Sequence, residues 1–231
     1  MKTIGMIGGI GPESTIDYYR RLVAAYRERR TDGSYPPILI NSINLQQMLR
    51  LIDAGELERL TGWLGIEIEK LANAGAQIGL LASNTPHLVF DELRSRSRLP
   101  LVSIVEATCA AADKLQLCKL GLFGARYTMQ GSFYPDVFAK NGIALIAPRP
   151  DEQTWIHDHY MNELVKGVFL PETRDGFLRV AERLRRDDHI EGLILGGTEL
   201  PLILRDVQGA GIPFLDTTQI HVDAVMAQVG L

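Results

Sequence analysis

Short apolar runs alternate with longer amphipathic stretches along the whole 231-residue chain, and this alternation constrains the fold more than any other feature. A parallel strand that is buried on both faces has a continuous apolar sequence, and the helix that leads to the next strand has one apolar face. The expected strands are Thr3–Ile7, Pro37–Ile43, Ile78–Ala82, Leu101–Ile104, Lys119–Phe123, Ala144–Ala147, Gly192–Leu195 and Phe214–Leu215. The expected helices include Ser14–Arg29, Glu56–Ala74, Val105–Leu115, Asp158–Lys166 and Glu172–Asp187. The sequence therefore predicts an α/β fold with mainly parallel sheets flanked by helices.

The charge and the cysteine content restrict the partners and the compartment. A formal net charge of −4 offers no basic surface to a phosphate backbone, so we expect no nucleic-acid partner. No apolar run reaches the roughly 18 residues that span a bilayer, and the opening MKTIGMIGG lacks the pattern of a signal peptide. We therefore expect a cytoplasmic protein that does not bind a membrane. The two cysteines, Cys109 and Cys118, lack the spacing of metal ligands, which predicts neither a metal site nor a disulfide framework.

An internal repeat indicates that half of the fold is duplicated. The segment IGMIGGIGPEST, from Ile4, is similar to LGLFGARYTMQ, from Leu120. The segment GLLASNTPHL is similar to LILGGTELPL, and this match pairs Ser83 with Gly197. The members of the two pairs are separated by nearly the same number of residues. We therefore predict two similar α/β domains related by pseudo-twofold symmetry.

The predicted first domain consists of residues 1–99 and 214–231, and residues 100–213 form the second. In a parallel α/β fold, ligands bind at the loops that follow the carboxyl ends of the strands. We expect a ligand site in the crevice between the two domains, formed by four polar motifs that follow apolar strands.

The first motif is GGIGPEST, Gly8 to Thr15, directly after the first expected strand. Its glycines let the backbone approach a small anion, and N–H groups near Gly9 would favour a carboxylate. Ser14 or Thr15 is expected to cap the helix that follows. The spacing differs from that of a dinucleotide-binding loop, and a tight turn without a ligand is the alternative interpretation.

The second motif is SNTPH, in which Ser83, Asn84 and Thr85 end an apolar run. Asn84 and Thr85 bring an amide and a hydroxyl to the strand end, where they could hold a carboxylate without adding a charge. Pro86 is expected to start the next helix. His87 is either an acid–base group or a residue that fixes the loop.

The third and fourth motifs occupy the equivalent positions in the second half of the chain. In GARYTMQ, Tyr127 and Thr128 follow a strand and could bind a carboxylate, and Arg126 either joins them or forms a structural ion pair. In GGTEL, Thr198 and Glu199 follow a buried strand, and the Glu199 carboxylate could hold an ammonium group or act as a base. A glutamate that only stabilises the start of a helix is the alternative.

Together, GGIGPEST, SNTPH, GARYTM and GGTELPL make the chain resemble the aspartate/glutamate racemase family over nearly its whole length. The resemblance implies an amino-acid racemase that uses no cofactor, whether pyridoxal phosphate or metal, and that is commonly a homodimer. Its partner would be a small-molecule acidic amino acid or related dicarboxylate. The Cα proton of this substrate is removed on one face and returned on the other, and the family usually uses one cysteine thiol from each half for these two steps.

The chain departs from this pattern at both catalytic positions, where it has Ser83 and Gly197. A serine hydroxyl is a far weaker acid than a thiol, and glycine has no side chain, so the two-thiol reaction cannot be written for this sequence. The substrate-binding residues that the resemblance implies are nevertheless present. They are Gly9, Asn84, Thr85, Tyr127, Thr128, Thr198 and Glu199, with His87 behind them.

Three functional hypotheses follow. The first is a racemase or epimerase of altered mechanism that acts on aspartate or glutamate, with water, His87 or Glu199 replacing the thiol opposite Ser83. The second is an isomerase or lyase for a related dicarboxylate, because glycine at position 197 would leave room for a bulkier substituent. The third is a protein that binds an acidic metabolite without turnover.

Overall fold

A computed structural model describes residues 1–204 and 211–230, and the chain separates into two compact units. The first unit consists of Met1–Ser103 and His221–Leu231, and the second of Ile104–Ile220. Both boundaries thus lie further along the chain than the predicted 99/100 and 213/214. The assignment of 214–220 to the first domain is wrong because the strand β7 (Phe214–Asp216) pairs in parallel with β6 (Gly192–Gly196) of the second unit.

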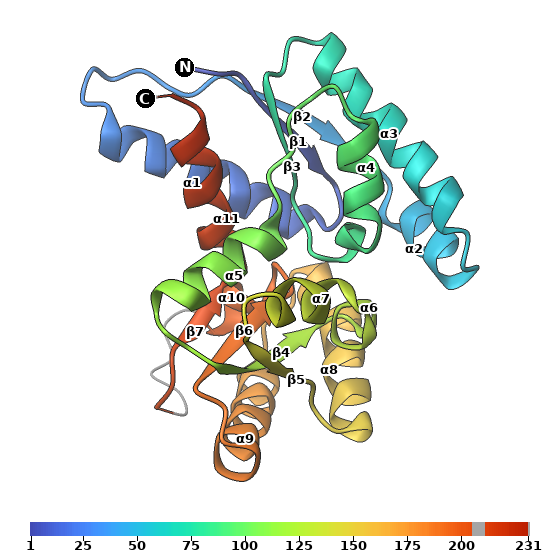
Figure 1. Cartoon of the computed structure of the whole chain (residues 1–231), viewed down its shortest axis with the longest axis vertical. Helices are drawn as coiled ribbons and strands as arrows, with labels where there is room; N and C mark the ends of the chain where they lie inside the picture. The colour runs from blue at the N-terminus through green and yellow to red at the C-terminus, as the bar shows by residue number, and fades with distance from the viewer. Residues whose placement is uncertain (205–210, 231) are drawn as a thin grey trace. The chain divides into compact units, whose positions relative to one another are not determined.

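The first unit contains a three-stranded parallel sheet in the order β2-β1-β3 (Figure 1). Its strands are β1 (Ile4–Gly8), β2 (Ile38–Ser42) and β3 (Ile78–Leu81). Its helices are α1 (Pro12–Arg29), α2 (Leu45–Asp53), α3 (Leu57–Asn73), the 3-10 helix η1 (Thr85–Val89) and α4 (Phe90–Arg96), and most of α11 (Thr217–Gln228) also belongs to it. Ile7 of β1 is paired with Leu81 of β3, so the loops that follow these two strands start side by side.

The second unit contains a four-stranded parallel sheet in the order β5-β4-β6-β7. Its two remaining strands are β4 (Lys119–Gly124) and β5 (Ala144–Ile146). Its helices are α5 (Ile104–Lys114), α6 (Arg126–Gln130), α7 (Phe133–Ala139), α8 (Pro150–Asn162), the 3-10 helix η2 (Leu164–Lys166), α9 (Pro171–Asp188) and α10 (Leu200–Leu204). The order β5-β4-β6 repeats β2-β1-β3, and Gly124 of β4 is paired with Gly196 of β6.

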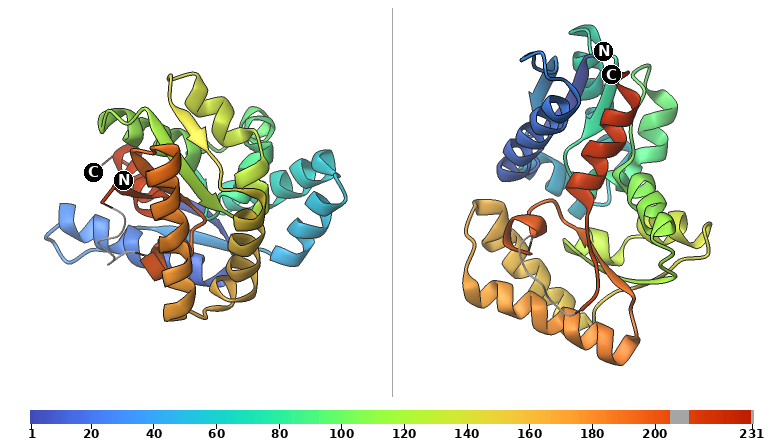
Figure 2. Two further views of the ribbon diagram at one scale, coloured as in Figure 1. Left: turned by 90° about the horizontal axis from the view of Figure 1, so that it is seen from below. Right: turned by 90° about the vertical axis from the view of Figure 1, so that its left-hand side faces the viewer.

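Helices cover both faces of each sheet (Figure 2), and side chains of one strand alternate between the two faces. In the first unit, Ile4 and Met6 pack in the cluster formed with α1 and α11, whereas Ile7 packs in the cluster formed with α3 and α4. In the second unit, Leu122 packs with α5 and α7, and Phe123 packs with α8 and α9. Burial on both faces explains why β1, β3 and β6 have continuous apolar sequences.

Two expected elements differ from the structure. The segment 101–104 is not a strand, because Leu101 forms only an isolated bridge with Gly79 and α5 already begins at Ile104. Pro100 precedes this bridge and has no N–H with which to extend the ladder. The helix expected at 158–166 corresponds to the last turn of α8 and the 3-10 helix η2. Helix α8 itself begins at Pro150, a residue type that fits the first turn of a helix.

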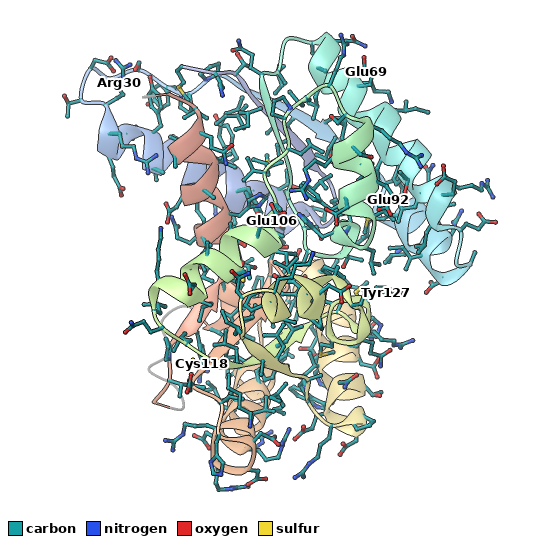
Figure 3. The ribbon with its side chains drawn as sticks, in the orientation of Figure 1. Arg30, Glu69, Glu92, Glu106, Cys118 and Tyr127 are labelled. Atoms are coloured by element: carbon teal, nitrogen blue, oxygen red, sulfur yellow. The ribbon has the colours of Figure 1, made fainter. Side chains whose placement is uncertain are left out.

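None of the described helices combines the length and the apolar character needed to cross a membrane. Both cysteines are free thiols; Cys109 is buried on α5, and Cys118 is exposed before β4 (Figure 3). Neither lies at the carboxyl end of a strand. Neither cysteine therefore occupies a position equivalent to Ser83 or Gly197.

Candidate functional site

The loop that follows β1 is closed by Thr15. Its hydroxyl accepts a hydrogen bond from the Gly9 N–H at 2.8 Å and donates one to the Gly11 carbonyl at 3.0 Å. Gly9 has a φ of +80°, and a Cβ there would collide with the backbone of Ile43, so this position requires glycine. The Gly9 N–H is paired inside the loop, and its contact with a carboxylate stays a prediction.

Ser14 connects the first motif to the second. Helix α1 begins at Pro12 without a side-chain cap, so the prediction that Ser14 or Thr15 caps it is wrong. Ser14 instead donates a hydrogen bond of 2.9 Å to the carbonyl of Ala82, one residue before Ser83. This bond holds the end of β3 against the helix that follows β1.

Ser83, Asn84 and Thr85 follow β3 and are buried, with 7%, 2% and 8% of their surface exposed. Pro86 lies in the first turn of η1, which confirms that it starts a helix. The structure thus places one amide and two hydroxyls together at a strand end. Uncharged donors of this kind can hold a carboxylate, although each needs a partner when buried.

His87 holds the turn that carries Ser83. Its Nδ1 donates a hydrogen bond of 3.1 Å to the Ser83 carbonyl, and its ring stacks on Phe90 with 4.6 Å between the ring centroids. Burial, together with the nearby His221, lowers the pKa of His87 from 6.5 to about 3. The ring is therefore neutral near pH 7, and these contacts favour the loop-fixing role over the acid–base role.

His221 is a buried residue that sequence reasoning missed. Its Nε2 donates to the Val102 carbonyl at 2.9 Å, so in the neutral ring Nδ1 accepts the hydrogen bond from the Tyr18 hydroxyl at 2.8 Å. Burial lowers the pKa of His221 from 6.5 to about 4. Tyr18 and His221 are 203 positions apart, and no local pattern in the sequence signals their contact.

In the second unit, Thr128 lies on α6 directly after β4 and is fully buried. Its side chain covers Gly124, where an added Cβ would lie 2.9 Å from the Thr128 Cβ. The Thr128 hydroxyl has no hydrogen-bond partner among the described residues. A buried hydroxyl in this state is a group that a ligand can satisfy.

Tyr127 and Arg126 lie at the outer side of the same turn. Tyr127 is half-buried (Figure 3), and its ring meets His157 edge to face, with 6.3 Å between centroids. The Arg126 N–H donates to Nδ1 of His157 at 3.1 Å, whereas its exposed guanidinium pairs with no carboxylate among the described residues. Within the described part of the chain, Arg126 thus forms no structural ion pair.

Gly197 does not border an empty space. A Cβ with ideal geometry at this residue would lie 2.5 Å from Cε2, 2.9 Å from Cζ and 3.0 Å from the hydroxyl of Tyr160. Tyr160 comes from α8 and packs in an apolar cluster of the second unit. The expectation that Gly197 leaves room for a bulkier substituent is therefore wrong, because the Tyr160 ring occupies that room.

Glu199 is buried, with 1% of its surface exposed, and is built into a hydrogen-bond network. Its Oε2 accepts hydrogen bonds from the Tyr160 hydroxyl and, at 3.1 Å, from the Thr198 hydroxyl. Burial and the adjacent carboxylate raise the pKa of Tyr160 well above 10, so the phenol keeps its proton. A glutamate that only stabilised the start of α10 would not need two side-chain donors.

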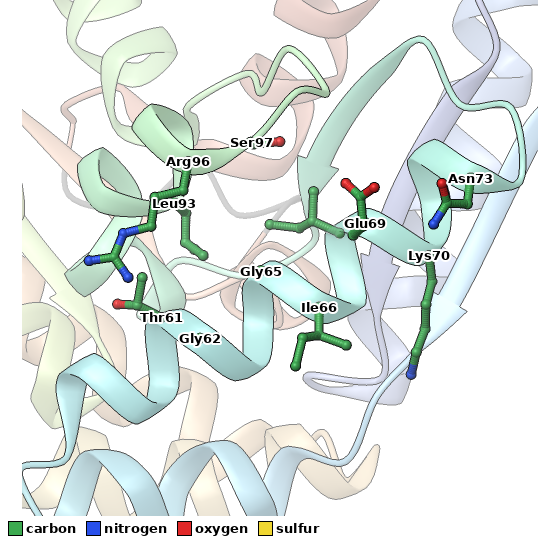
Figure 4. A pocket seen from close by; sticks show the side chains of 11 residues that line it. Thr61, Gly62, Gly65, Ile66, Glu69, Lys70, Asn73, Leu93, Arg96 and Ser97 are labelled. Carbon is green, nitrogen blue, oxygen red and sulfur yellow. The ribbon is translucent and has the colours of Figure 1, made fainter.

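A surface hollow of about 470 Å³ lies between α3 and α4 of the first unit (Figure 4). None of the predicted site residues lines it. Gly62, Gly65 and the exposed Ile66 contribute to its wall. Its charged side chains are engaged in ion pairs: Glu69 with Arg98, Lys70 with Glu67, and Arg96 with Glu58. We therefore place the candidate site at the strand ends and not in this hollow.

Each unit thus presents buried polar groups close to the carboxyl end of at least one of its strands. They are Ser83, Asn84 and Thr85 after β3, and Thr128, Thr198, Glu199 and Tyr160 in the second unit. Within the described part of the chain, no three His, Cys, Asp or Glu side chains form a group that could hold a metal ion. The polar groups offer hydrogen bonds to a small polar ligand and one buried carboxylate that can exchange a proton.

Comparison with known proteins agrees with this architecture. The family model for the Asp/Glu/Hydantoin racemases matches residues 7–225. The chain is 26% identical over 229 residues to the broad specificity amino-acid racemase RacX of Bacillus subtilis, which covers 93% of this chain and 92% of that protein. A candidate Asp/Glu racemase from Yersinia pestis is 31% identical and superposes with a TM-score of 0.89 over 99% of both chains.

An aspartate racemase homologue from Pyrococcus horikoshii is also 31% identical, with a TM-score of 0.84 over 99% of both chains. The family match includes all four motifs and every strand except the first residues of β1. Because it extends over nearly the whole chain, this protein belongs to the Asp/Glu/Hydantoin racemase family.

Proposed function

We propose that the protein is an amino-acid racemase or epimerase that acts on aspartate or glutamate. It removes and returns the Cα proton without a cofactor, using polar groups that follow the strands. The observation that carries the proposal is the repetition of one arrangement: β1 pairs with β3 as β4 pairs with β6. Buried polar side chains follow β3, β4 and β6, namely Ser83 to Thr85, Thr128, and Thr198 with Glu199.

The uncharged groups suit the chemistry of the substrate carboxylates. When the Cα proton leaves, negative charge spreads onto the α-carboxylate, and donors that are already in place stabilise it. Asn84 and Thr85 supply an amide and a hydroxyl in the first unit, and the Thr128 hydroxyl supplies a donor in the second. His87 adds no positive charge near pH 7, because its pKa is lowered to about 3.

The relatives support an amino acid as the substrate. The Bacillus subtilis protein is described as a broad specificity amino-acid racemase, and the Pyrococcus horikoshii protein as an aspartate racemase homologue. The resemblance of the four motifs to the aspartate/glutamate racemases supports an acidic substrate within this proposal. Ser83 and Gly197 require that groups other than two thiols carry the protons.

Deuterium exchange at Cα tests the proposal. The protein is incubated in D₂O with L- or D-aspartate and with L- or D-glutamate, and incorporation is followed by NMR and mass spectrometry. We expect deuterium at Cα and interconversion of the enantiomers for at least one amino acid. Thermal stabilisation by these ligands without any exchange would contradict the proposal and indicate a binding protein.

A matched pair of variants tests the binding role. Thr85→Val keeps the shape of a buried side chain but removes its hydroxyl, and we expect KM to rise about 10- to 100-fold, as for loss of a hydrogen bond to a charged group. Thr154→Val removes the hydroxyl of an exposed threonine of α8 and should leave KM unchanged. Equal KM values for the two variants would remove Thr85 from the binding residues.

A further inference from the structure

Tyr160 occupies the place in which the second thiol of the family would stand. Its hydroxyl lies 3.0 Å from the position of a Cβ at residue 197, and its ring atoms lie closer still. A cysteine side chain at this position would therefore overlap Tyr160. At Gly197, where the motif match places a thiol in the family, this chain instead has a phenol from a different element, α8, in the same space.

The phenol is directly linked to the buried carboxylate. The Tyr160 hydroxyl donates to Oε2 of Glu199, and the Thr198 hydroxyl donates to the same oxygen at 3.1 Å. Tyr160 and Glu199 are buried, with 7% and 1% of their surface exposed. A buried carboxylate is costly unless it is hydrogen-bonded, so the contact fixes both side chains in one arrangement.

We propose that Tyr160 and Glu199 form a proton relay that replaces the second thiol, with Tyr160 as the group that meets the substrate and Glu199 as the group that stores the proton. The inference rests on the proposed racemase or epimerase function. It assigns a task to Tyr160, which no sequence motif identified.

Protons and charge are conserved when the relay runs in either direction. In the basic state, Glu199 is a carboxylate and Tyr160 is a phenol. The C–H electron pair stays on the substrate Cα, the proton moves to the Tyr160 oxygen, and the original phenol proton passes to Oε2 of Glu199. The reverse transfer returns a proton to Cα and restores the Glu199 carboxylate.

Tyr160 remains a neutral phenol before and after each transfer. This agrees with its environment, because burial and the Glu199 carboxylate raise the pKa of the phenol well above 10. A stable phenolate beside a carboxylate is not required at either end of the step. The charge resides on Glu199, whose Oε2 accepts hydrogen bonds from the Tyr160 and Thr198 hydroxyls.

Three variants test the relay by Cα deuterium exchange, measured separately from the L and the D enantiomer. Tyr160→Phe keeps the ring beside Gly197 and removes the relay oxygen. Glu199→Gln keeps an acceptor for the phenol but cannot store the proton. Tyr134→Phe is the matched control, because Tyr134 is another fully buried tyrosine of the second unit and belongs to a different cluster, with α5 and α7.

We expect Tyr160→Phe and Glu199→Gln each to lower exchange from one and the same enantiomer by at least about 100-fold, the usual effect of losing an acid–base group. Exchange from the other enantiomer should fall much less, because its proton leaves towards the opposite face. A purely structural defect would lower both rates together. Thermal melts with and without ligand establish that each variant is folded and binds the amino acid.

The relay is overturned if Tyr160→Phe exchanges both enantiomers as fast as Tyr134→Phe does, or if it loses both rates equally. Either result in a protein whose wild type exchanges Cα protons leaves the racemase proposal intact. Absence of exchange in the wild type, by contrast, overturns the racemase proposal and the relay with it. The wild-type measurement therefore separates the two failures.

Discussion

Replacing Gly197 with alanine should destabilise the second unit by about 1–3 kcal/mol, the usual cost of overpacking a core. The added Cβ would lie 2.5 Å from Cε2 and 2.9 Å from Cζ of Tyr160. Favourable contacts between carbon atoms are about 3.5–4.0 Å, so ring or backbone must move by roughly an ångström. The ring cannot move freely, because it packs in an apolar cluster and its hydroxyl is bound to Glu199.

Urea denaturation measures this cost. Trp63 lies in the first unit and Trp155 in the second, so a Trp63→Phe background makes tryptophan fluorescence report on the second unit. In this background, Tyr160→Ala alone should cost about 3–5 kcal/mol. Adding Gly197→Ala to Tyr160→Ala should cost almost nothing, because the obstructing ring is gone. The coupling between the two substitutions should thus exceed about 1 kcal/mol.

Gly62 provides the control for the glycine substitution. It lies on α3, and a Cβ there would meet nothing within 4 Å. Gly62→Ala should therefore stabilise the first unit by about 0.5–1 kcal/mol, because alanine is favoured over glycine inside a helix. If Gly197→Ala leaves the unfolding midpoint unchanged, or if its cost is the same with and without the Tyr160 ring, the steric argument is refuted.

Three further predictions concern other parts of the site. The double variant Ser83→Cys, Gly197→Cys should show little two-thiol racemisation, whereas the triple variant that also carries Tyr160→Ala should show more. Circular dichroism of aspartate measures both rates, and equal rates for the double and the triple variant would contradict the prediction. The pKa of His221 is lowered from 6.5 to about 4 in the folded protein. As the pH drops below about 6.5, the unfolded chain therefore takes up a proton that the folded protein does not, and the stability falls. This loss reaches about 2 kcal/mol at pH 5, and His221→Gln should reduce the difference in urea midpoint between pH 7 and pH 5. Gly9→Ala should cost more than about 2 kcal/mol, because φ is +80° and the Cβ meets backbone; an unchanged midpoint would refute this.

The fold was largely predictable because its signals are local. Each strand of the two sheets begins in or contains an apolar run, and the runs are unbroken in the fully buried strands β1, β3 and β6. The error at Leu101 has the same origin, because a short apolar run beside Pro100 resembles a strand but gains only one bridge. The domain boundary near β7 was misplaced because the pairing of β7 with β6 decides where the boundary lies, and a three-residue strand carries no sequence signal for its partner.

The site was predictable only where its residues are contiguous. Asn84 and Thr85, and likewise Thr198 and Glu199, follow their strands directly, so the ends of β3 and β6 reveal them. His221 and Tyr160 enter from helices remote in the sequence, and their burial depends on packing that no periodicity encodes. The sequence therefore showed that a thiol was absent at Gly197 but not that a phenol had taken its place.

In this structure, the Tyr160 ring and the missing side chain of Gly197 depend on each other. The ring leaves no space for a Cβ, and without the ring the glycine would border a cavity. We therefore expect family members with cysteine at the position of Gly197 to have a smaller side chain at that of Tyr160, and an alignment of the family checks this. Frequent pairing of cysteine with tyrosine would show that the ring can move aside. Tyr160 would then not be locked against Gly197, and the positional basis of the proton relay would be lost.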